Sequence, residues 1–231
     1  MLGLVTIGQS PREDIIQSMF GHSSHPDLVQ AGALDTLGVA EISVLAPRDG
    51  DHLLVTRLAD GAEVVIAKER VTALMNDAIQ RLERSGATII CVLCTGEFTG
   101  LVSERRIVYP DRVLAGVVDA VLPEGTLGLV IPHVGQRDSM ARKWARSRRS
   151  VELSVVSPYD ESGSFERAAV DLVSAGSDMI VLDCMGYSVD MQTQAQSAVS
   201  VPVMVANGVV GAVLTSVLPR LSGSLQYAVR L

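Results

Sequence analysis

The sequence has few cysteines, no excess of positive charge and no glycine- or proline-rich tract. Three cysteines in 231 residues are too few for the disulfide framework of a small secreted domain. Lysine and arginine number 19 against 26 aspartate and glutamate, so the net charge of −7 provides no basic field for nucleic acid or an anionic membrane. With 20 glycines and 9 prolines the chain is not collagen-like, and its 48% hydrophobic content excludes a disordered chain.

Cofactor motifs and targeting signals are also missing. Neither a phosphate-binding loop nor a dinucleotide glycine fingerprint occurs in the chain, so the sequence indicates no cofactor. Residues 1–5 lack a basic region before the first apolar run, which favours a cytoplasmic protein. Residues 195–219 carry no charge, but Pro202 and Asn207-Gly208 interrupt them, as is typical of a strand, a turn and a helix rather than a membrane span. The one dense basic segment, residues 137–149, is interpreted as a solvated helix face.

Short apolar segments rich in valine and isoleucine alternate with helical patterns. The predicted strands are residues 2–7, 40–45, 88–93, 127–131, 153–156, 179–182 and 201–205. Their continuous apolar character is typical of mostly parallel sheets that are covered on both faces. Apolar residues recur at helical spacing within 71–82 and 165–173, and Gly86 and Gly176 stand where helix C-terminal caps belong. This alternation predicts an α/β fold.

The two halves of the chain resemble each other. The tripeptide GLV opens a predicted strand at Gly3 and again at Gly128, and residues 112–123 parallel 208–219. A glycine, an apolar run, a cysteine and a second glycine follow with equal spacing at 86–96 and 176–186. We therefore predict two pseudo-symmetric, duplicated α/β domains with mostly parallel sheets facing a shared cleft. Their predicted bounds are 1–122 plus 208–231, where the last helix returns to the first domain, and 123–207. A β-hairpin, residues 53–58 and 63–67, is predicted as an insertion in the first domain.

Polar residues follow the ends of four predicted strands, in residues 6–12, 94–98, 132–136 and 183–187. Because ligands bind beyond the carboxyl ends of strands in open parallel sheets, we expect these loops to line the cleft. Cys94 and Cys184 would then stand on opposite walls. Cys91 lies inside an apolar strand and is interpreted as a small buried hydrophobe.

Two thiols on opposite walls suit proton transfer at a carbon next to a carboxylate, because one thiolate removes a proton from one face while the other thiol protonates the opposite face. A thiol near helix N-termini has a lowered pKa, so at least one of Cys94 and Cys184 is expected to react with iodoacetamide faster than Cys91. Gly96 and Gly186 would allow backbone N–H groups to approach a substrate carboxylate or enolate. No clustered spacing of ligands indicates a metal site.

The first loop supplies the candidate cation. Arg12 follows Pro11, the predicted first position of a helix that Ser10 would cap, and is expected to form a bidentate pair with an anionic ligand. The alternative for Arg12 is an ion pair with a neighbouring acid such as Asp14. His133 either orients a substrate or only bonds within its loop, whereas His22, His25 and His52 are given no role. The candidate substrate-binding residues, besides Arg12, are Thr6, Gln9, Ser10, Thr95, Gly96, His133 and Gly186.

Four segments resemble the AroM family: TIGQSPRED at 6–14, EVVIAKE at 63–69, CTGEF at 94–98 and LDCMG at 182–186. The resemblance covers nearly the whole chain. That family is similar to the aspartate/glutamate/hydantoin racemase superfamily, whose members have two pseudo-symmetric α/β domains, a catalytic cysteine from each and no cofactor. The resemblance implies that Cys94 and Cys184 are these cysteines. Thr-Gly and Met-Gly follow them where amino-acid racemases carry Asn-Thr and Thr-His, so the resemblance does not extend to the substrate.

Together these patterns predict a cofactor-independent racemase or isomerase of a small carboxylate, with Cys94 and Cys184 as the acid–base pair. Decarboxylation and cis–trans isomerisation occur in the same superfamily. The alternative is a small-molecule-binding or regulatory protein that retains the fold without turnover. The expected partner is a small anionic molecule and not nucleic acid or membrane, and a homodimer is left open.

Overall fold

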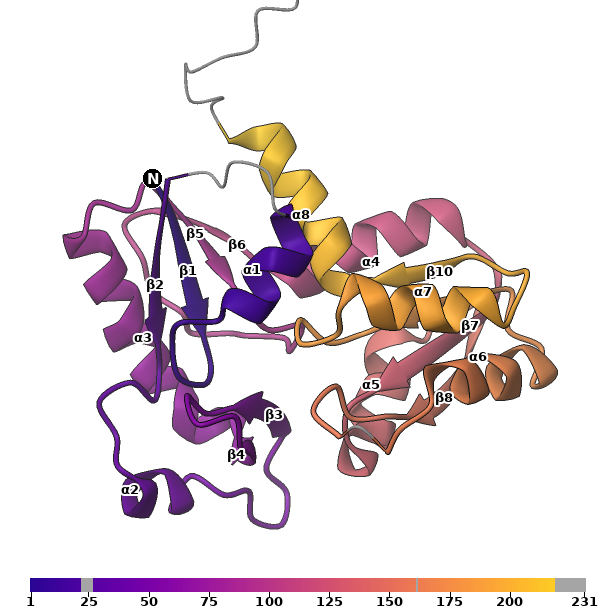
Figure 1. Cartoon of the computed structure of the whole chain (residues 1–231), viewed down its shortest axis with the longest axis horizontal. Coiled ribbons are helices and arrows are strands. Elements are labelled where there is room, and N and C mark those ends of the chain that lie inside the picture. Colours follow the sequence, from indigo (N-terminus) through magenta and orange to yellow (C-terminus); the bar gives the residue numbers. More distant parts are fainter. Residues whose placement is uncertain (22–26, 161, 219–231) are drawn as a thin grey trace, which may run out of the picture.

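Two four-stranded parallel sheets organise the computed structural model, which describes residues 1–21, 27–160 and 162–218. The first sheet has the order β2-β1-β5-β6 and the second β10-β9-β7-β8, with every neighbouring pair parallel. Figure 1 shows the two sheets as separate halves of the molecule. The strands of the first sheet are β1 (Leu2–Thr6), β2 (Leu28–Gly32), β5 (Ile89–Val92) and β6 (Arg106–Val108), and those of the second are β7 (Gly125–Ile131), β8 (Arg149–Val155), β9 (Met179–Leu182) and β10 (Val203–Val205).

The internal repeat appears in the strand register. Gly3 of β1 pairs with Ile90, and Gly128 of β7 pairs with Ile180 at the equivalent place in the second sheet. A Cβ atom at Gly3 would lie 2.9 Å from the Cβ of Ala87, and one at Gly128 would lie 2.8 Å from the hydroxyl of Ser177. Because Ala87 and Ser177 begin the turn into the cysteine-bearing strand, the repeated glycine makes room for the same helix-to-strand connection in both halves. The predicted duplication is confirmed at this level.

Helices cover both faces of the sheets. The helices are α1 (Glu13–Phe20), α2 (Val39–Ser43), α3 (Lys68–Arg84), α4 (Pro110–Val121), the 3₁₀ turn η1 (Val134–Gln136), α5 (Arg137–Trp144), α6 (Phe165–Ser174), α7 (Val189–Ser197) and α8 (Ala206–Val217). Leu4 and Val5, neighbours on β1, belong to different apolar clusters, as expected for a sheet buried on both faces. The cluster that contains Leu4 also contains Leu129 of β7, so one core joins the two halves.

Helix α8 lies against helices of the first half of the chain. It packs against α1 and α4 (Figure 1). A Cβ atom at Gly211 would collide with the carbonyl oxygen of Met19, so the glycine permits a close crossing of α8 over α1. The proposed domain boundary between 207 and 208 stays a prediction, and residues 219–231 of the first domain lie outside the described residues.

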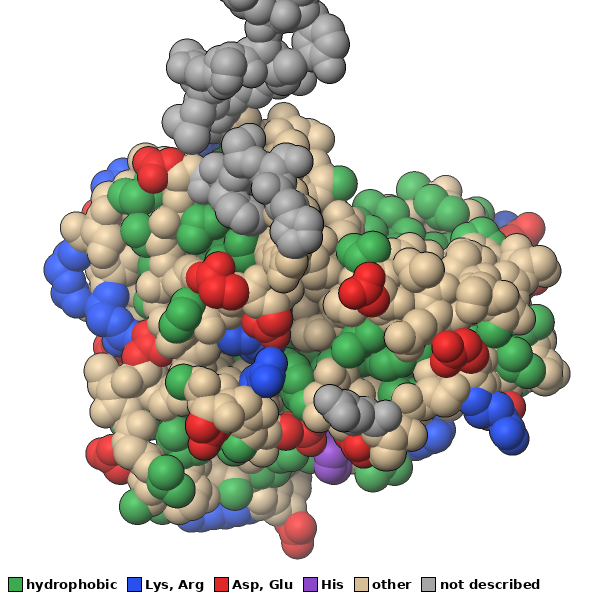
Figure 2. Space-filling view, in the orientation of Figure 1, with side chains coloured by type: hydrophobic (Ala, Val, Ile, Leu, Met, Phe, Trp, Pro, Cys, Tyr) green, Lys and Arg blue, Asp and Glu red, His purple; other side chains and the backbone are tan. Residues whose placement is uncertain are grey.

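The predicted hairpin is present as β3 (Leu53–Arg57) and β4 (Glu63–Ala67), a separate antiparallel pair. It belongs to the first half but also contacts the second half. The side chain of Gln136 donates a 3.2 Å hydrogen bond to the carbonyl oxygen of Leu53, and the hydroxyl of Ser157 bonds the carboxylate of Glu63. On the face shown in Figure 2 the surface is hollowed along the seam between the halves.

The structure departs from the predicted local structure at three places. Residues 40–45 form no strand, because α2 occupies most of this segment, with the Glu41 carboxylate accepting a bond from the N–H of Gly38. The strands β2 and β6, which were not predicted, complete the first sheet. The interpretation of residues 137–149 as a solvated helix face holds for Arg137, Arg142, Arg146 and Arg148, which are exposed. It is wrong for the end of the segment, since the helix ends at Trp144 and both Trp144 and Arg149 are buried.

The uncharged segment 195–219 divides between the end of α7, the strand β10 and the helix α8. Within the described residues, no helix has the length and apolar character needed to cross a membrane.

Candidate active site

Two of the three cysteines stand just beyond equivalent strand ends. Cys94 follows β5 and Cys184 follows β9, and both thiols are partly exposed. Cys91 lies within β5 and is fully buried, as predicted. The strand-end cysteines therefore meet the first requirement of a thiol site, which is access from a cavity.

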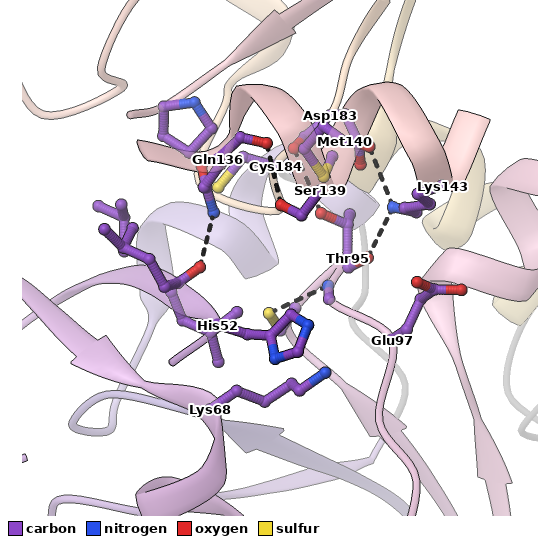
Figure 3. Close-up of a pocket in the computed structure, with 16 residues that line it drawn as sticks. His52, Lys68, Thr95, Glu97, Gln136, Ser139, Met140, Lys143, Asp183 and Cys184 are labelled. Atoms are coloured by element: carbon purple, nitrogen blue, oxygen red, sulfur yellow. Dashed lines mark hydrogen bonds and ion pairs between the residues drawn. The ribbon is translucent and has the colours of Figure 1, made fainter. Parts of the chain in front are cut away.

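Cys94 and Cys184 line one cavity between the two halves, with a volume of about 70 Å³. From the first half the lining residues are His52, Leu53, Leu54, Val55, Lys68, Cys94, Thr95, Gly96 and Glu97. From the second half they are Pro132, Gln136, Ser139, Met140, Lys143, Asp183 and Cys184. Figure 3 shows the polar side chains that surround this space. The base of the hairpin contributes one wall, so the inserted segment is part of the site.

Each thiol accepts a hydrogen bond from the backbone N–H of the glycine two residues further along the chain. The N–H of Gly96 donates to the sulfur of Cys94 at 3.3 Å, and the N–H of Gly186 donates to the sulfur of Cys184 at 3.4 Å. The repeated cysteine-x-glycine motif thus places a donor on each sulfur, where it would favour the thiolate. The glycine N–H groups were expected to serve a substrate oxygen, but in this structure they bond the thiols.

Both cavity thiols are protonated at neutral pH, contrary to the expected thiolate character. Burial raises the pKa of Cys94 to about 12 and that of Cys184 to about 11, although the glycine N–H groups act in the opposite direction. The lowering that helix N-termini were expected to provide is absent, because within the described residues no helix begins directly after either cysteine. The first helix after Cys94 is α4, which begins at Pro110, and α7 begins at Val189, five residues beyond Cys184.

Alkylation by iodoacetamide is expected to follow this order of pKa values. Below pH 11 the rate at Cys184 should rise about tenfold per pH unit, since only the thiolate reacts, and Cys184 should react ahead of Cys94. Cys91 should stay unmodified because its side chain is inaccessible. Peptide mapping of time courses at pH 7, 8 and 9 measures all three. Equal inertness of the three cysteines at every pH would contradict an accessible thiol pair.

A clamp across the cavity connects the residues next to the two cysteines. The hydroxyl of Thr95 donates to the carbonyl oxygen of Asp183 at 3.2 Å, and the amino group of Lys143 donates to the carbonyl oxygen of Thr95 at 2.8 Å. Lys143 also donates to the Asp183 carboxylate at 3.0 Å, as does the indole of Trp144 at 2.5 Å (Figure 3). Because Thr95 follows Cys94 and Asp183 precedes Cys184, these bonds hold the two thiol loops together.

Arg12 is not among the residues that line this cavity, although its charge acts against the burial that raises the pKa of Cys184. Its guanidinium forms a bidentate pair with Asp14, at 2.9 and 2.7 Å, and donates to the hydroxyl of Tyr159 at 3.1 Å. Although burial alone would lower it, the hydrogen bond with Asp14 raises the pKa of Arg12. Only 4% of Arg12 is exposed. The ion pair with Asp14, which was the alternative to ligand binding, therefore holds a buried guanidinium and not a surface one. Asp14 occupies the edge of the Arg12 guanidinium that a ligand carboxylate would need for a bidentate pair.

The other predicted binding residues divide into two groups. Thr95 and Gly96 line the cavity, whereas Thr6, Gln9, Ser10, His133 and Gly186 are not among its lining residues. Their polar groups have partners in the fold: the hydroxyl of Thr6 accepts from the N–H of Gly8, Gln9 bonds the backbone at Leu34 and Ala59, Ser10 bonds Asp35, and His133 Nδ1 accepts from the N–H of Gly135. The Gly186 N–H is used by Cys184.

The expected cap of the first helix is also wrong. Helix α1 begins at Glu13, with Arg12 in the capping position and no side-chain cap. Ser10 and Pro11 therefore precede the helix. Ser10 bonds Asp35 instead, which fastens the first loop to the end of β2.

Sequence reasoning missed Lys143, His52 and Lys68. Lys143 lies in the basic segment that was assigned to a solvated surface, yet its side chain is 7% exposed. His52 and Lys68 flank the inserted hairpin, which has no counterpart in the repeat, so comparing the two halves gives no signal for them. Within the described part of the chain, no group of three His, Cys, Asp or Glu side chains is arranged to hold a metal ion.

The fold defines a structural class of α/β proteins that includes solved structures of a glutamate racemase, a maleate isomerase and a decarboxylase. Within that class, a family model described as AroM protein matches residues 2–218, and the chain belongs to this family. None of the curated proteins compared with the chain matches it.

Three solved structures illustrate the class. A maleate isomerase, Iso from Pseudomonas putida, has a TM-score of 0.61 at 11% identity, over 93% of this chain and 91% of that chain. Arylmalonate decarboxylase has a TM-score of 0.58 at 14% identity, over 90% and 88%. A glutamate racemase from Francisella tularensis in complex with D-glutamate has a TM-score of 0.57 at 10% identity, over 93% and 79%. At these identities the similarity shows the fold.

Proposed function

We propose that the protein is a cofactor-independent racemase or isomerase that transfers protons at the carbon next to a carboxylate. The observation that carries this proposal is the placement of Cys94 and Cys184 at equivalent strand ends, partly exposed, on one cavity between the halves. A thiol from each half gives the reacting carbon an acid–base group on either side. A proton that moves directly between the reacting carbon and a cysteine sulfur needs no further acid–base group to carry it.

The proposed reaction begins when one cavity thiol, which is partly exposed, loses its proton to water and becomes a thiolate. That thiolate takes the proton from the carbon, the electron pair is delocalised into the carboxylate as an enolate, and the second thiol protonates the opposite face. The carbon is thereby inverted, and the two sulfurs exchange roles. The thiolate therefore remains on the second sulfur after one turnover. Because burial favours the protonated forms, only a small fraction of the protein carries the thiolate that starts the reaction at neutral pH.

Relatives of the same fold support this reaction class. The glutamate racemase, the maleate isomerase and the arylmalonate decarboxylase are all named for small carboxylates. Their different reactions share a carbon next to a carboxylate, so the fold accommodates chemistry at that position. The clamp between Thr95, Asp183 and Lys143 adds a means of keeping the two thiol loops at a fixed spacing.

Deuterium exchange in D₂O tests this function. The protein is incubated with aspartate, glutamate, phenylmalonate or maleate, and proton NMR follows loss of the Cα–H signal or conversion of the substrate. We expect exchange with at least one carboxylate, at a rate that rises between pH 7 and 9 because more thiolate forms as the pH approaches the thiol pKa values. A rate that falls over this range would contradict a thiolate base. Tight binding of a carboxylate without exchange would instead support a binding or regulatory protein.

A further inference from the structure

Three basic side chains line the cavity, and two of them already have acidic partners. Lys143 is paired with Asp183 at 3.0 Å, and His52 Nδ1 lies 2.6 Å from the carboxylate of Glu69. Lys68 is different. Among the described residues, no carboxylate lies within ion-pair distance of its amino group and no side-chain hydrogen bond is made to it. In Figure 3 the Lys68 side chain extends alongside His52, and no interaction reaches its amino group.

The position of Lys68 in the fold gives no structural reason for a cation. Lys68 is the first residue of α3, directly after β4. The N-terminus of a helix carries a partial positive charge, so a lysine there is repelled, and acidic residues are the ones that stabilise this turn. The residue is also half-buried, which removes part of the water that would otherwise stabilise the charge. A local charge conflict that the fold does not compensate is typical of a functional position.

The other charges around the cavity leave room for an anion. Lys143 and Asp183, which both line the cavity, neutralise each other as a buried ion pair. Glu97 is exposed at the cavity, where water screens its charge. Lys68 is thus the one lining cation of the described residues whose charge is available to a ligand.

We propose that Lys68 binds the carboxylate of an anionic ligand, so that the hairpin side of the cavity holds the acidic group while the two thiols face the reacting carbon. The inference rests on the proposed function for the identity of the reacting carbon. It assigns the ligand class independently: a small molecule with at least one carboxylate that reaches Lys68. Arg12, paired with Asp14, takes no part in this contact.

Competing alkylating reagents test the proposal without knowledge of the natural substrate. Iodoacetate carries a carboxylate and iodoacetamide is its neutral counterpart, and both react with thiolates. Both rates are proportional to the fraction of thiolate, so this fraction drops out of the ratio of the iodoacetate rate to the iodoacetamide rate at one thiol. The ratio therefore reports how strongly the cavity attracts the anionic reagent. We expect Lys68→Gln to lower this ratio about fivefold at Cys94, Cys184 or both, because a cation close to the reagent carboxylate is lost. An unchanged ratio at both thiols would overturn the proposal.

Two matched variants control for net charge and for shape. Arg84→Gln removes the same charge from the last residue of the same helix, about 24 Å away at 1.5 Å per residue, and should leave the ratio unchanged. Lys68→Arg retains the charge and should keep most of the preference for iodoacetate. An equal loss in Arg84→Gln would assign the effect to overall charge and refute a specific role of Lys68. The iodoacetamide rate of each variant reports whether the cavity is intact.

Failure of this inference can be told from failure of the proposed function. Reagent preference depends on Lys68 and needs no turnover, whereas deuterium exchange depends on the thiols acting on a substrate. A ratio that falls in Lys68→Gln, in a protein that exchanges none of the carboxylates, would support the anion site and refute the isomerase. Deuterium exchange with a carboxylate, together with an unchanged ratio in Lys68→Gln, would support the isomerase and refute the anion site. Addition of salt should lower the wild-type ratio toward that of Lys68→Gln.

Discussion

Replacing either Cys94 or Cys184 with serine is expected to slow Cα deuterium exchange by about 10²–10⁴-fold, the usual contribution of a positioned acid or base. Serine keeps the size of the side chain, but its hydroxyl is far less acidic than a thiol and does not supply the required anion. Exchange is measured by NMR with whichever carboxylate the wild-type protein turns over.

Cys91→Ala is the matched control for the cysteine variants. Cys91 lies in β5, three positions before Cys94, but is fully buried and is not among the residues that line the cavity. Its replacement should leave the exchange rate within about twofold, with a modest loss of stability from the smaller side chain. Retention of the wild-type rate by Cys94→Ser or Cys184→Ser would refute a mechanism that needs both thiols.

Lys143→Met is expected to lower the free energy of unfolding by about 3–5 kcal/mol, the cost of leaving one member of a buried ion pair without its partner. The side chains of Lys143 and Asp183 are 7% and 0% exposed, so water cannot replace the lost charge. Asp183 would keep its bond from Trp144, which does not neutralise a carboxylate. Urea denaturation followed by fluorescence of Trp144 measures the change.

Two further variants identify the cause of that loss. The double variant Lys143→Met/Asp183→Asn removes the stranded charge but keeps an acceptor for Trp144, so it should recover much of the lost stability. Arg167→Met removes one member of an exposed pair with Asp171, whose side chains are 78% and 58% exposed, and should change the free energy of unfolding by less than about 0.5 kcal/mol. A Lys143→Met effect as small as that of Arg167→Met would show that the clamp does not stabilise the fold.

The repeat made the central architecture predictable. Gly3 and Gly128, together with the spacing from capping glycine to cysteine, predict the equivalent strands that end just before Cys94 and Cys184. The error at residues 40–45 has a physical cause, because a short apolar run is compatible with a strand and with one buried side of a short helix. Neither the length of the 40–45 segment nor its flanking residues distinguish a strand from a short helix.

The charged part of the site was harder to predict than its thiols. The ion pair of Arg12 with Asp14 was foreseen as the alternative, but its burial was not, because Tyr159, which it also contacts, lies 147 positions away. Lys143 looked solvated because the buried Asp183 that pairs with it lies 40 positions away. In both cases the missed contact joins residues far apart in the sequence, which a local pattern does not encode. Thiols at strand ends, in contrast, are positioned by short-range register.

The β3–β4 hairpin is present in only one half of a duplicated fold. Two identical halves would present a ligand with twofold-related walls, and a molecule could then bind in either of two reversed poses with equal energy. The hairpin abolishes that degeneracy, because His52 and Lys68 occupy one wall and have no mates on the other. Equivalent strand-end positions of the thiols therefore coexist with different walls. In the proposed reaction Cys94 and Cys184 would act on both faces of one carbon, while the hairpin wall would allow only one pose of that carbon's substituents.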